Sequence, residues 1–329
     1  MPDLRTELRR AREIVRRRPK LGPEPCLPPP LPAGATVTVP GRGELFYRRL
    51  DGPERPLGAG SDGPERPLGA GSDDPALPVL LLHGWMWTAD LNWWSVYEPL
   101  AATNPVLAVD HRDHGRSMRT EGAFSLEEAA DDHAALLDLL GIEKVIVCGY
   151  SMGGPIAMLL AERHPEKVAG MVLAGTTLDF SSGSWVATGR WRLMPVLGGL
   201  IRLGHFDRIV ARHLRWSVER EPDIAPYRSW MLGEWRRQAA KDIVEGGEAM
   251  AAFDLRDRAA ALAHLPSAVV MPTRDQLVEP WRQRALAVAI GAEVVELDAD
   301  HFANFEAPKV LAEAIVDAVS RVSARLGRP

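Results

Sequence analysis

The chain has 329 residues, of which 46% are hydrophobic and 25% are charged, and its formal net charge is −5. This composition is ordinary for a globular protein, and the length suits one large domain or one domain with a substantial insertion. The negative charge argues against a chain built to bind nucleic acid or anionic membranes, and no apolar run approaches the ~18 residues of a transmembrane helix.

Residues 1–35 predict a basic and proline-rich tail outside the globular domain. Residues 1–20 are rich in arginine but lack the apolar stretch of a signal peptide, so a solvated and partly helical segment is the simplest interpretation. Residues 21–35 are rich in proline and should be extended. Cys26 and Cys148 are the two cysteines, and they give no reason to expect a structural disulfide. These features fit a cytoplasmic protein.

The next segment predicts two strands and then a flexible loop. Residues 36–49 have strand patterns on both sides of a Pro-Gly turn. The sequence DGPERPLGAGS at 51–61 is repeated without change at 62–72. Two copies are too few for a solenoid, and each is rich in proline and glycine with a single leucine. We therefore expect residues 51–75 to be a duplicated surface loop.

From residue 77 onward, apolar runs alternate with helical patterns. A continuous apolar run is typical of a strand buried on both faces of a parallel sheet. Ser125 and Glu128 form a capping box at the start of one helix, and Gly141 supplies its C-terminal stop. The predicted strands are 78–84, 104–110, 144–150, 168–176, 267–273 and 292–300. The predicted helices are 92–102, 125–141, 152–164, 280–290 and 307–326. The fold class is therefore α/β, with a mostly parallel central sheet and helices on both faces.

The alternation stops between residues 178 and 250. This segment is rich in Trp, Arg and Leu at helical spacing and has no clear strand. A helical insertion at this point is placed to cover the C-terminal edge of the sheet, where α/β active sites lie. We predict a core formed by residues 36–177 and 251–329 and a helical cap, or lid, at 178–250.

The sequence CGYSMGG at 148–154 predicts a nucleophile. It lies between a predicted strand and a predicted helix, so Ser151 sits on a sharp strand-to-helix turn. Side chains at Gly149 and Gly153 would collide across such a turn. A serine hydroxyl is a poor nucleophile until a base takes its proton, so the motif also requires a histidine and an acid later in the chain.

His301 is the candidate base, because it directly follows the last predicted strand. Asp275 follows the preceding strand, which gives the chain order Ser151, Asp275, His301. Asp179, after the strand that precedes the cap, is the runner-up acid. Ordinary alternatives exist for each residue taken alone, such as a surface histidine or a loop ion pair. Their order at strand ends favours a Ser-His-Asp triad.

Two backbone amides are candidates to hold the oxyanion. One is the N–H of Met152, the residue after the nucleophile. The other is the N–H of Trp85, in the turn after the 78–84 strand, where Gly84 and His83 precede it. We expect His83 to brace this loop rather than to act as an acid or a base.

Two further patterns have simpler interpretations. His111 and His114 have metal-ligand spacing, but they lie in one loop, and we expect no metal site. The tryptophans near the oxyanion loop predict core packing or an apolar wall for a substrate, and the sequence does not separate the two. They are Trp85, Trp87, Trp93 and Trp94. Nothing in the sequence calls for a cofactor.

The chain contains HGW at 83–85, DHRDHGRS at 110–117, GYSMGG at 149–154, TRD at 273–275 and DH at 300–301. Together these motifs resemble the α/β-hydrolase superfamily, most of all the lidded esterase, lipase and haloperoxidase-like branch seen in bacteria. The resemblance covers roughly residues 36–329. Asp113 departs from the family pattern D-x-R-G-x-G-x-S. Because aspartate tolerates a left-handed backbone, we expect a small loop adjustment there.

The leading interpretation is a serine hydrolase of the carboxylesterase or lipase type. Its partner would be a small or medium apolar carboxylic ester, cleaved through an acyl-enzyme. C–C bond hydrolysis and cofactor-free perhydrolysis, as in haloperoxidases, use the same triad and stay open. Serine at position 151 argues against haloalkane dehalogenases and epoxide hydrolases, which resemble this fold but need aspartate there. A non-catalytic binding protein with this fold is the alternative from another class. The sequence leaves the oligomeric state open.

Overall fold

The computed structural model describes residues 27–52, 76–181 and 222–327. Three predicted features fall wholly or mainly outside these ranges. They are the arginine-rich segment 1–20, the duplicated loop 51–75 and residues 182–221 of the predicted cap. The division into core and cap therefore stays a prediction.

The described residues form an eight-stranded sheet with the order β1-β2-β4-β3-β5-β6-β7-β8. The β1–β2 and β2–β4 pairs are antiparallel and all other pairs are parallel, as expected for a mostly parallel sheet. The strands are β1 Gly34–Val39, β2 Gly43–Leu50, β3 Val79–Leu82, β4 Val106–Val109, β5 Val145–Tyr150, β6 Val168–Ala174, β7 Ser267–Pro272 and β8 Glu293–Leu297.

Burial follows the apolar pattern of the sequence. Every residue of β3, β4, β5, β6 and β7 is buried, because helices cover both faces of these strands. The edge strands β1 and β8 have exposed or partly exposed residues instead. Their alternating patterns are those of strands covered on one side.

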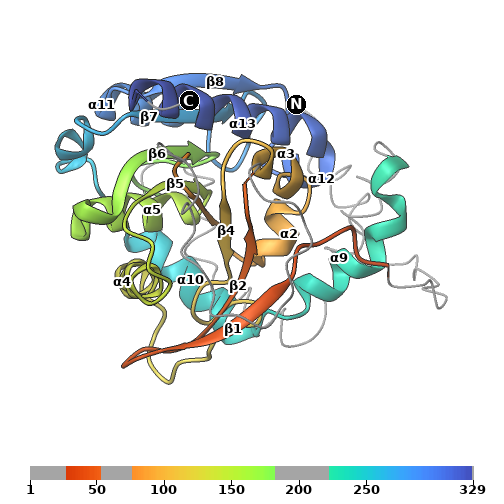
Figure 1. Cartoon of the computed structure of the whole chain (residues 1–329). Helices are drawn as coiled ribbons and strands as arrows, with labels where there is room; N and C mark the ends of the chain where they lie inside the picture. The colour runs from red at the N-terminus through yellow and green to blue at the C-terminus, as the bar shows by residue number, and fades with distance from the viewer. Residues whose placement is uncertain (1–26, 53–75, 182–221, 328–329) are drawn as a thin grey trace, which may run out of the picture.

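Two layers of helices enclose the sheet. One apolar cluster packs α4, α5 and α11 against one face, and a second packs α2, α3 and α13 against the other. Figure 1 shows α4 and α5 on one side of the sheet and α2 and α3 on the opposite side. The core helices are α2 Ala89–Trp93, α3 Tyr97–Ala101, α4 Leu126–Leu139, α5 Gly153–Arg163, α11 Pro280–Ile290, α12 Ala303–Glu306 and α13 Pro308–Arg325. Short 3₁₀ turns lie at η1 Pro165–Lys167, η2 Pro222–Tyr227 and η3 Ala259–Leu262.

Local signals explain where several helices begin and end. The Ser125 side chain accepts a hydrogen bond from the backbone N–H of Glu128 at 3.2 Å, and Gly141 after α4 has φ 65°. The single helix predicted over 92–102 is wrong, because the chain forms α2 and α3 there. Pro99 explains the break. It cannot continue a helix from residue 92, but it is tolerated in the first turn of α3.

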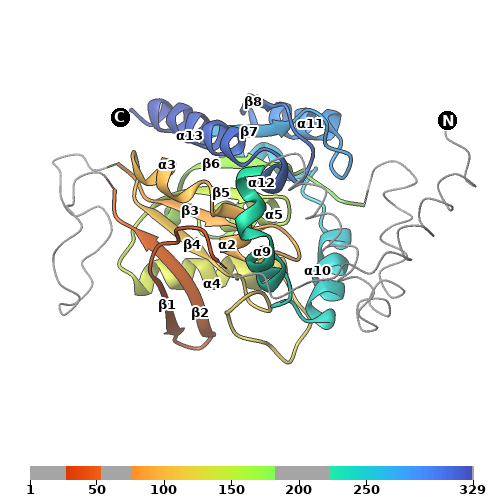
Figure 2. The same cartoon turned by 90° about the vertical axis from the view of Figure 1, so that its right-hand side faces the viewer.

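The helices α9 Arg228–Trp235 and α10 Ala240–Ala252 lie between β6 and β7 in the chain. They form the last part of the predicted cap. Figure 1 shows α9 and α10 as two separate helices that follow one another along the chain, and Figure 2 gives the view turned by 90°. Among the helices of the described ranges, none is both long enough and apolar enough to cross a bilayer.

Candidate active site

Ser151 occupies a sharp turn between β5 and α5 and has a left-handed backbone, with φ 51°. A Cβ on Gly149 would lie 2.2 Å from the carbonyl oxygen of Gly153, and a Cβ on Gly153 would lie 2.2 Å from that of Leu82. Only glycine fits at these two positions, which is the steric reason the sequence suggests. Non-glycine residues in this conformation concentrate at functional sites.

His301 lies between the other two residues of the predicted triad. Its Nε2 is 3.0 Å from Ser151 Oγ, and its Nδ1 is 2.7 Å from Asp275 Oδ2. β5, β7 and β8 run parallel and deliver these side chains to the same edge of the sheet. Ser151 is 8% exposed, Asp275 3% and His301 4%. A neutral ring that donates from Nδ1 to the carboxylate presents the Nε2 lone pair to the serine hydroxyl.

The Asp275 carboxylate is held by more than the histidine. Its Oδ1 accepts the backbone N–H groups of Leu277 and Val278, both at 2.8 Å. Its Oδ2 also accepts from the side-chain amide of Gln283 at 3.1 Å. These donors fix the carboxylate, and through it the plane of the His301 ring. Sequence reasoning missed Gln283, because its position one turn into α11 is not part of any motif.

Asp179, the runner-up acid, lies elsewhere in the fold. Its Oδ1 is 3.4 Å from Arg282 Nη2, and its Oδ2 is 3.7 Å from Arg256 Nε. Its backbone forms an isolated bridge with Asp254. The residue that meets His301 Nδ1 is therefore Asp275.

The loop after β3 lies against the serine. A Cβ on Gly84 would lie 3.3 Å from the Cβ of Ser151. The Gly84 N–H donates to Asn92 Oδ1 in α2 at 2.8 Å, and the carbonyl oxygen of Gly84 lies 2.8 Å from His83 Nδ1. His83 is 0% exposed and sits directly behind the loop. The Gly84 backbone is thus fixed at both its N–H and its C=O.

The next residue of this loop connects the core to α10. The indole N–H of Trp85 donates to the carbonyl oxygen of Ile243 at 2.8 Å. A Cβ on Gly246 would lie 3.0 Å from the indole ring, so α10 packs closely over Trp85. Met152, which carries the other candidate amide, directly precedes α5. The start of a helix favours developing negative charge.

The comparisons with known proteins agree with this architecture. The family model described as "alpha/beta hydrolase fold" matches residues 78–308. The chain belongs to the α/β-hydrolase family. Two of the first curated relatives are matched over less than two thirds of their own length, 60% in one case and 64% in the other.

Three similar proteins show which members of this family the chain resembles. A 2-hydroxymuconate semialdehyde hydrolase from Pseudomonas sp. (strain CF600) is 40% identical over 182 residues, covering 50% of this chain and 64% of that protein. A pimeloyl-(acyl-carrier protein) methyl ester esterase from Neisseria meningitidis serogroup C is 30% identical over 198 residues, covering 59% and 71%. The enol-lactonase structure from Burkholderia xenovorans LB400 has a TM-score of 0.68 at 26% identity, covering 87% of this chain and 100% of that one.

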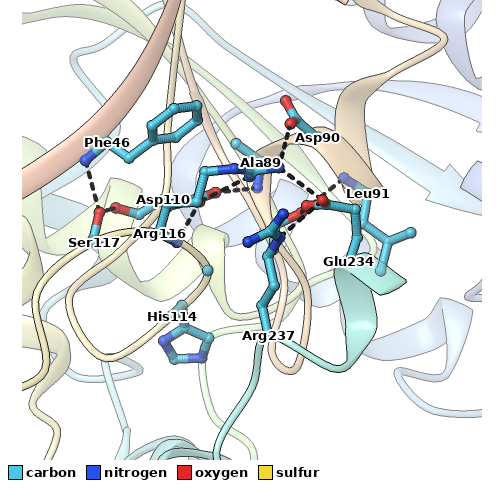
Figure 3. Close-up of polar contacts among 12 residues, drawn as sticks. Phe46, Ala89, Asp90, Leu91, Asp110, His114, Arg116, Ser117, Glu234 and Arg237 are labelled. Atoms are coloured by element: carbon cyan, nitrogen blue, oxygen red, sulfur yellow. Dashed lines mark hydrogen bonds and ion pairs between the residues drawn. The ribbon is translucent and has the colours of Figure 1, made fainter. Parts of the chain in front are cut away.

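This α/β-hydrolase has a largely buried charged network that joins the loop after β4 to α2 and α9 (Figure 3). Arg116 is its centre. Its guanidinium lies 3.1 Å from Asp90, 3.3 Å from Asp110 and 2.7 Å from Glu234. Glu234 belongs to α9, is 3% exposed and also pairs with Arg237 at 2.9 Å. The network therefore joins α9 to the core, and no sequence motif pointed to Glu234.

Asp110 in this network has a raised pKa. Burial raises the pKa of its carboxyl from 3.8 to about 6, although Arg116 opposes the shift. Its Oδ1 accepts the backbone N–H of Ala89 at 2.7 Å, and its Oδ2 accepts that of Arg116 at 2.9 Å. Asp110 thereby ties the loop after β4 to the start of α2.

Asp113, the departure from the family pattern, has φ 58° and is therefore left-handed. Its carboxylate accepts hydrogen bonds from the backbone N–H of Thr120 at 2.6 Å and from the Thr120 hydroxyl at 2.8 Å. These two bonds compensate a conformation that glycine would adopt without strain.

Two patterns singled out in the sequence are a His-x-x-His spacing and a group of tryptophans. The rings of His111 and His114 are 6.1 Å apart and nearly perpendicular, and their Nδ1 atoms contact His133 and the carbonyl oxygen of Arg112. Within the described ranges, no set of His, Cys, Asp and Glu side chains is arranged to hold a metal ion. Trp93 is fully buried in the core.

Proposed function

We propose that the chain is a serine hydrolase that cleaves a small or medium apolar carboxylic ester through an acyl-enzyme. The observation that carries this proposal is the continuous chain from Ser151 Oγ through His301 to Asp275, with distances of 3.0 and 2.7 Å. A buried and fully partnered arrangement of this kind has no evident use in a binding protein. It supports a catalytic role over the non-catalytic alternative.

The residues of the site act in two half-reactions in this scheme. Ser151 Oγ attacks the ester carbonyl carbon while His301 Nε2 takes the hydroxyl proton. Asp275 holds the ring in the required tautomer and stabilises the imidazolium. The N–H groups of Met152 and Trp85 bind the oxyanion. His301 then gives its proton to the leaving alcohol, which departs and leaves the acyl group on Ser151. In the second half, His301 takes a proton from water, the hydroxide attacks the acyl carbon, and the acid leaves as Ser151 regains its proton.

The side chains beside the triad favour an apolar substrate. The ring of Phe302 lies 5.9 Å from the ring of His301, and Phe302 is partly exposed. Trp85, which follows Gly84 in the loop beside Ser151, is also partly exposed. Ligand pockets are lined mainly by such apolar and aromatic groups. An esterase among the similar proteins is consistent with ester chemistry.

C–C bond hydrolysis is the second candidate, and one observation favours it. Among the similar proteins named above, the highest identity, 40%, is to a 2-hydroxymuconate semialdehyde hydrolase. The two chemistries are separated by turnover. A p-nitrophenyl ester series and 2-hydroxymuconate semialdehyde are compared by kcat/KM, and the higher value identifies the reaction.

Active-site labelling and turnover test the triad. We expect a fluorophosphonate to add one adduct mass to the wild type and to Ser320→Ala, an exposed serine on α13, and none to Ser151→Ala. Ser151→Ala should lower ester turnover at least ~10³-fold, because the nucleophile is absent. Equal labelling or near-normal turnover in Ser151→Ala would refute the scheme.

The acid is tested by a matched pair of variants. Asp275→Asn should lower kcat by roughly 10³–10⁴, because an amide at this position no longer selects the Nδ1–H tautomer of His301. Asp179→Asn should stay within about threefold, since its carboxylate faces Arg282 and not His301. A larger loss in Asp179→Asn would mean that the acid is wrongly assigned.

A further inference from the structure

Three histidines beside the oxyanion loop form a chain of hydrogen bonds that this mechanism leaves unused. His133 lies on α4, His111 follows β4 and His83 follows β3, and each is 0% exposed. His133 Nε2 is 2.8 Å from His111 Nδ1, and His111 Nε2 is 3.0 Å from the His83 carbonyl oxygen. The backbone N–H of His111 donates to His83 Nε2 at 3.1 Å, and His83 Nδ1 is 2.8 Å from the carbonyl oxygen of Gly84.

The partners determine the tautomer of every ring. A backbone N–H can only donate, so His83 Nε2 is an acceptor and the His83 hydrogen is on Nδ1, where it donates to Gly84. A carbonyl oxygen can only accept, so His111 carries its hydrogen on Nε2. His111 Nδ1 is then an acceptor, and His133 must donate to it from Nε2. The side-chain donors therefore run in one direction, from His133 to His111 and from His83 to Gly84.

Burial keeps the rings neutral. It lowers the pKa of His83 and His111 well below the usual value, and neighbouring histidines add to the effect. It also lowers the pKa of His133 to about 4, although the adjacent Asp132 opposes the shift. A second proton on His111 would place two N–H groups face to face, so the chain of hydrogen bonds requires neutral rings.

This chain of hydrogen bonds ends at the carbonyl oxygen of the Gly84–Trp85 peptide. The carbonyl of Gly84 and the N–H of Trp85 belong to one planar trans peptide, so they point in opposite directions. Holding the Gly84 oxygen against His83 therefore sets the direction of the Trp85 N–H. Gly84 also lies beside Ser151, so this peptide is held next to the reacting serine.

We propose that His111 and His133 are positioning residues for the hydrolysis. Through His83 they hold the Gly84–Trp85 peptide in place and so aim the Trp85 N–H at the oxyanion. The inference rests on the proposed function. His133 is the most informative position, because its Nε2 contacts His111 and it is separated from the Gly84–Trp85 peptide by His111 and His83.

Replacing His133 separates positioning from packing. His133→Leu removes the donor to His111 Nδ1, which frees the His111 ring to tilt or to change tautomer. His133→Gln keeps an N–H donor at the place of Nε2. Leu136→Ala, a fully buried change on the same helix, is the control for lost stability without loss of the hydrogen bond.

The readouts are kcat and KM for p-nitrophenyl butyrate and the inhibition constant of a trifluoromethyl ketone, whose hemiketal oxyanion occupies the oxyanion site. Full loss of one oxyanion donor costs ~10²–10³ in rate, so we expect a misaimed donor in His133→Leu to lower kcat roughly 10-fold. KM should stay within about twofold, and the ketone should bind roughly 10-fold more weakly, because both the transition state and the hemiketal use this donor. His133→Gln and Leu136→Ala should stay within about threefold of wild type in all three values.

Each outcome decides the inference. If the wild type turns over and is labelled at Ser151 while His133→Leu matches it in kcat and ketone affinity, the positioning role is wrong and the proposed function stands. If the wild type neither turns over nor is labelled, the proposed function fails and the inference fails with it. If His133→Leu does not fold, ¹⁵N-histidine NMR of the wild type decides. Nδ1–H on His83 with Nε2–H on His111 and His133 supports the inference, and any other set overturns it.

Discussion

Residues 110–117 take part in two buried polar networks of different chemistry. One network consists of three neutral imidazole rings, each of which has one N–H donor and one nitrogen acceptor. The rings are those of His83, His111 and His133. In the other network, Arg116 is surrounded by carboxylates. The same loop contributes to both networks, through His111 on one side and Asp110 and Arg116 on the other.

The two networks differ in whether they can orient a single atom or only hold elements together. A neutral ring has one donor direction and one acceptor direction, so a chain of rings determines orientation. A guanidinium has five donors and attracts carboxylates from several sides, so it fastens elements together without aiming any single atom. We therefore expect damage to the histidine network to appear in catalysis and damage to the charged network to appear in stability.

The largest effect expected on stability is that of Arg116→Met. The substitution leaves Asp110 without a side-chain cation and weakens the attachment of Glu234, so buried carboxylates lose their compensation. We expect a loss of about 3 kcal/mol or more in the free energy of unfolding, measured with urea, because a buried charge without its partner is strongly destabilising. The kcat should change less than about threefold at a temperature where the variant is folded.

Arg284→Met is the matched control. Arg284 pairs with Glu296 at 2.8 Å, but both side chains are more than half exposed. Its loss should be within about 0.5 kcal/mol, as is typical of exposed ion pairs. A stable Arg116→Met variant with a large fall in kcat would reverse the comparison, since the charged network would then be the one that aims the loop.

The triad and these two networks differ in how much of them the sequence could predict. Ser151, Asp275 and His301 each follow a strand of the parallel part of the sheet, which brings such positions to one edge, so their proximity was predictable from local patterns. Glu234 and His133 lie within helices and meet their partners across 118 and 22 residues of sequence. No local spacing encodes such contacts. The only signal was chemical, in that each interrupts an otherwise apolar helix face.

The helices and strands also divide into those that the local sequence could predict and those that it could not. Strands β3 to β7 could be located because each is one uninterrupted apolar run, and α4 because Ser125 caps it. The break between α2 and α3 was missed, although Pro99 marks it. α12, next to His301, was also missed, because four residues are too few to show a helical period.

The next prediction concerns the pH dependence of stability, to which the buried histidines and Asp110 contribute with opposite signs. Burial holds the pKa of His114 and of His133 at about 4 in the folded chain, against 6.5 when exposed. Between pH 6.5 and 4 the unfolded chain binds more protons at these rings, so stability falls as the pH falls. For Asp110 the folded pKa of about 6 lies above 3.8, so the folded chain binds more protons and gains stability in the acid part of this window.

Histidines outnumber the opposing carboxyls, since only Asp242 joins Asp110 with a pKa raised to about 6 among the described residues. We expect the free energy of unfolding to fall from pH 7 to pH 4.5. His133 alone contributes up to about 3 kcal/mol over the full window, so His133→Leu should lose less stability on acidification than wild type. Urea titrations at both pH values test this, with the exposed His264→Leu as the control. Equal stability of the wild type at both pH values would contradict it.

The smallest effect expected is at Asp113, which lies between the two networks and where the chain departs from the family pattern. Asp113→Gly relieves a left-handed backbone but loses two hydrogen bonds to Thr120, whereas Asp113→Ala loses the same bonds and keeps the strain. The difference in the free energy of unfolding between these two variants isolates the contribution of backbone strain. We expect the alanine variant to be less stable than the glycine variant by about 1 kcal/mol. Urea unfolding of both variants measures it. If the two are equally stable, the Thr120 contacts rather than the backbone govern this turn, and the loop that carries both networks is held by its side chains alone.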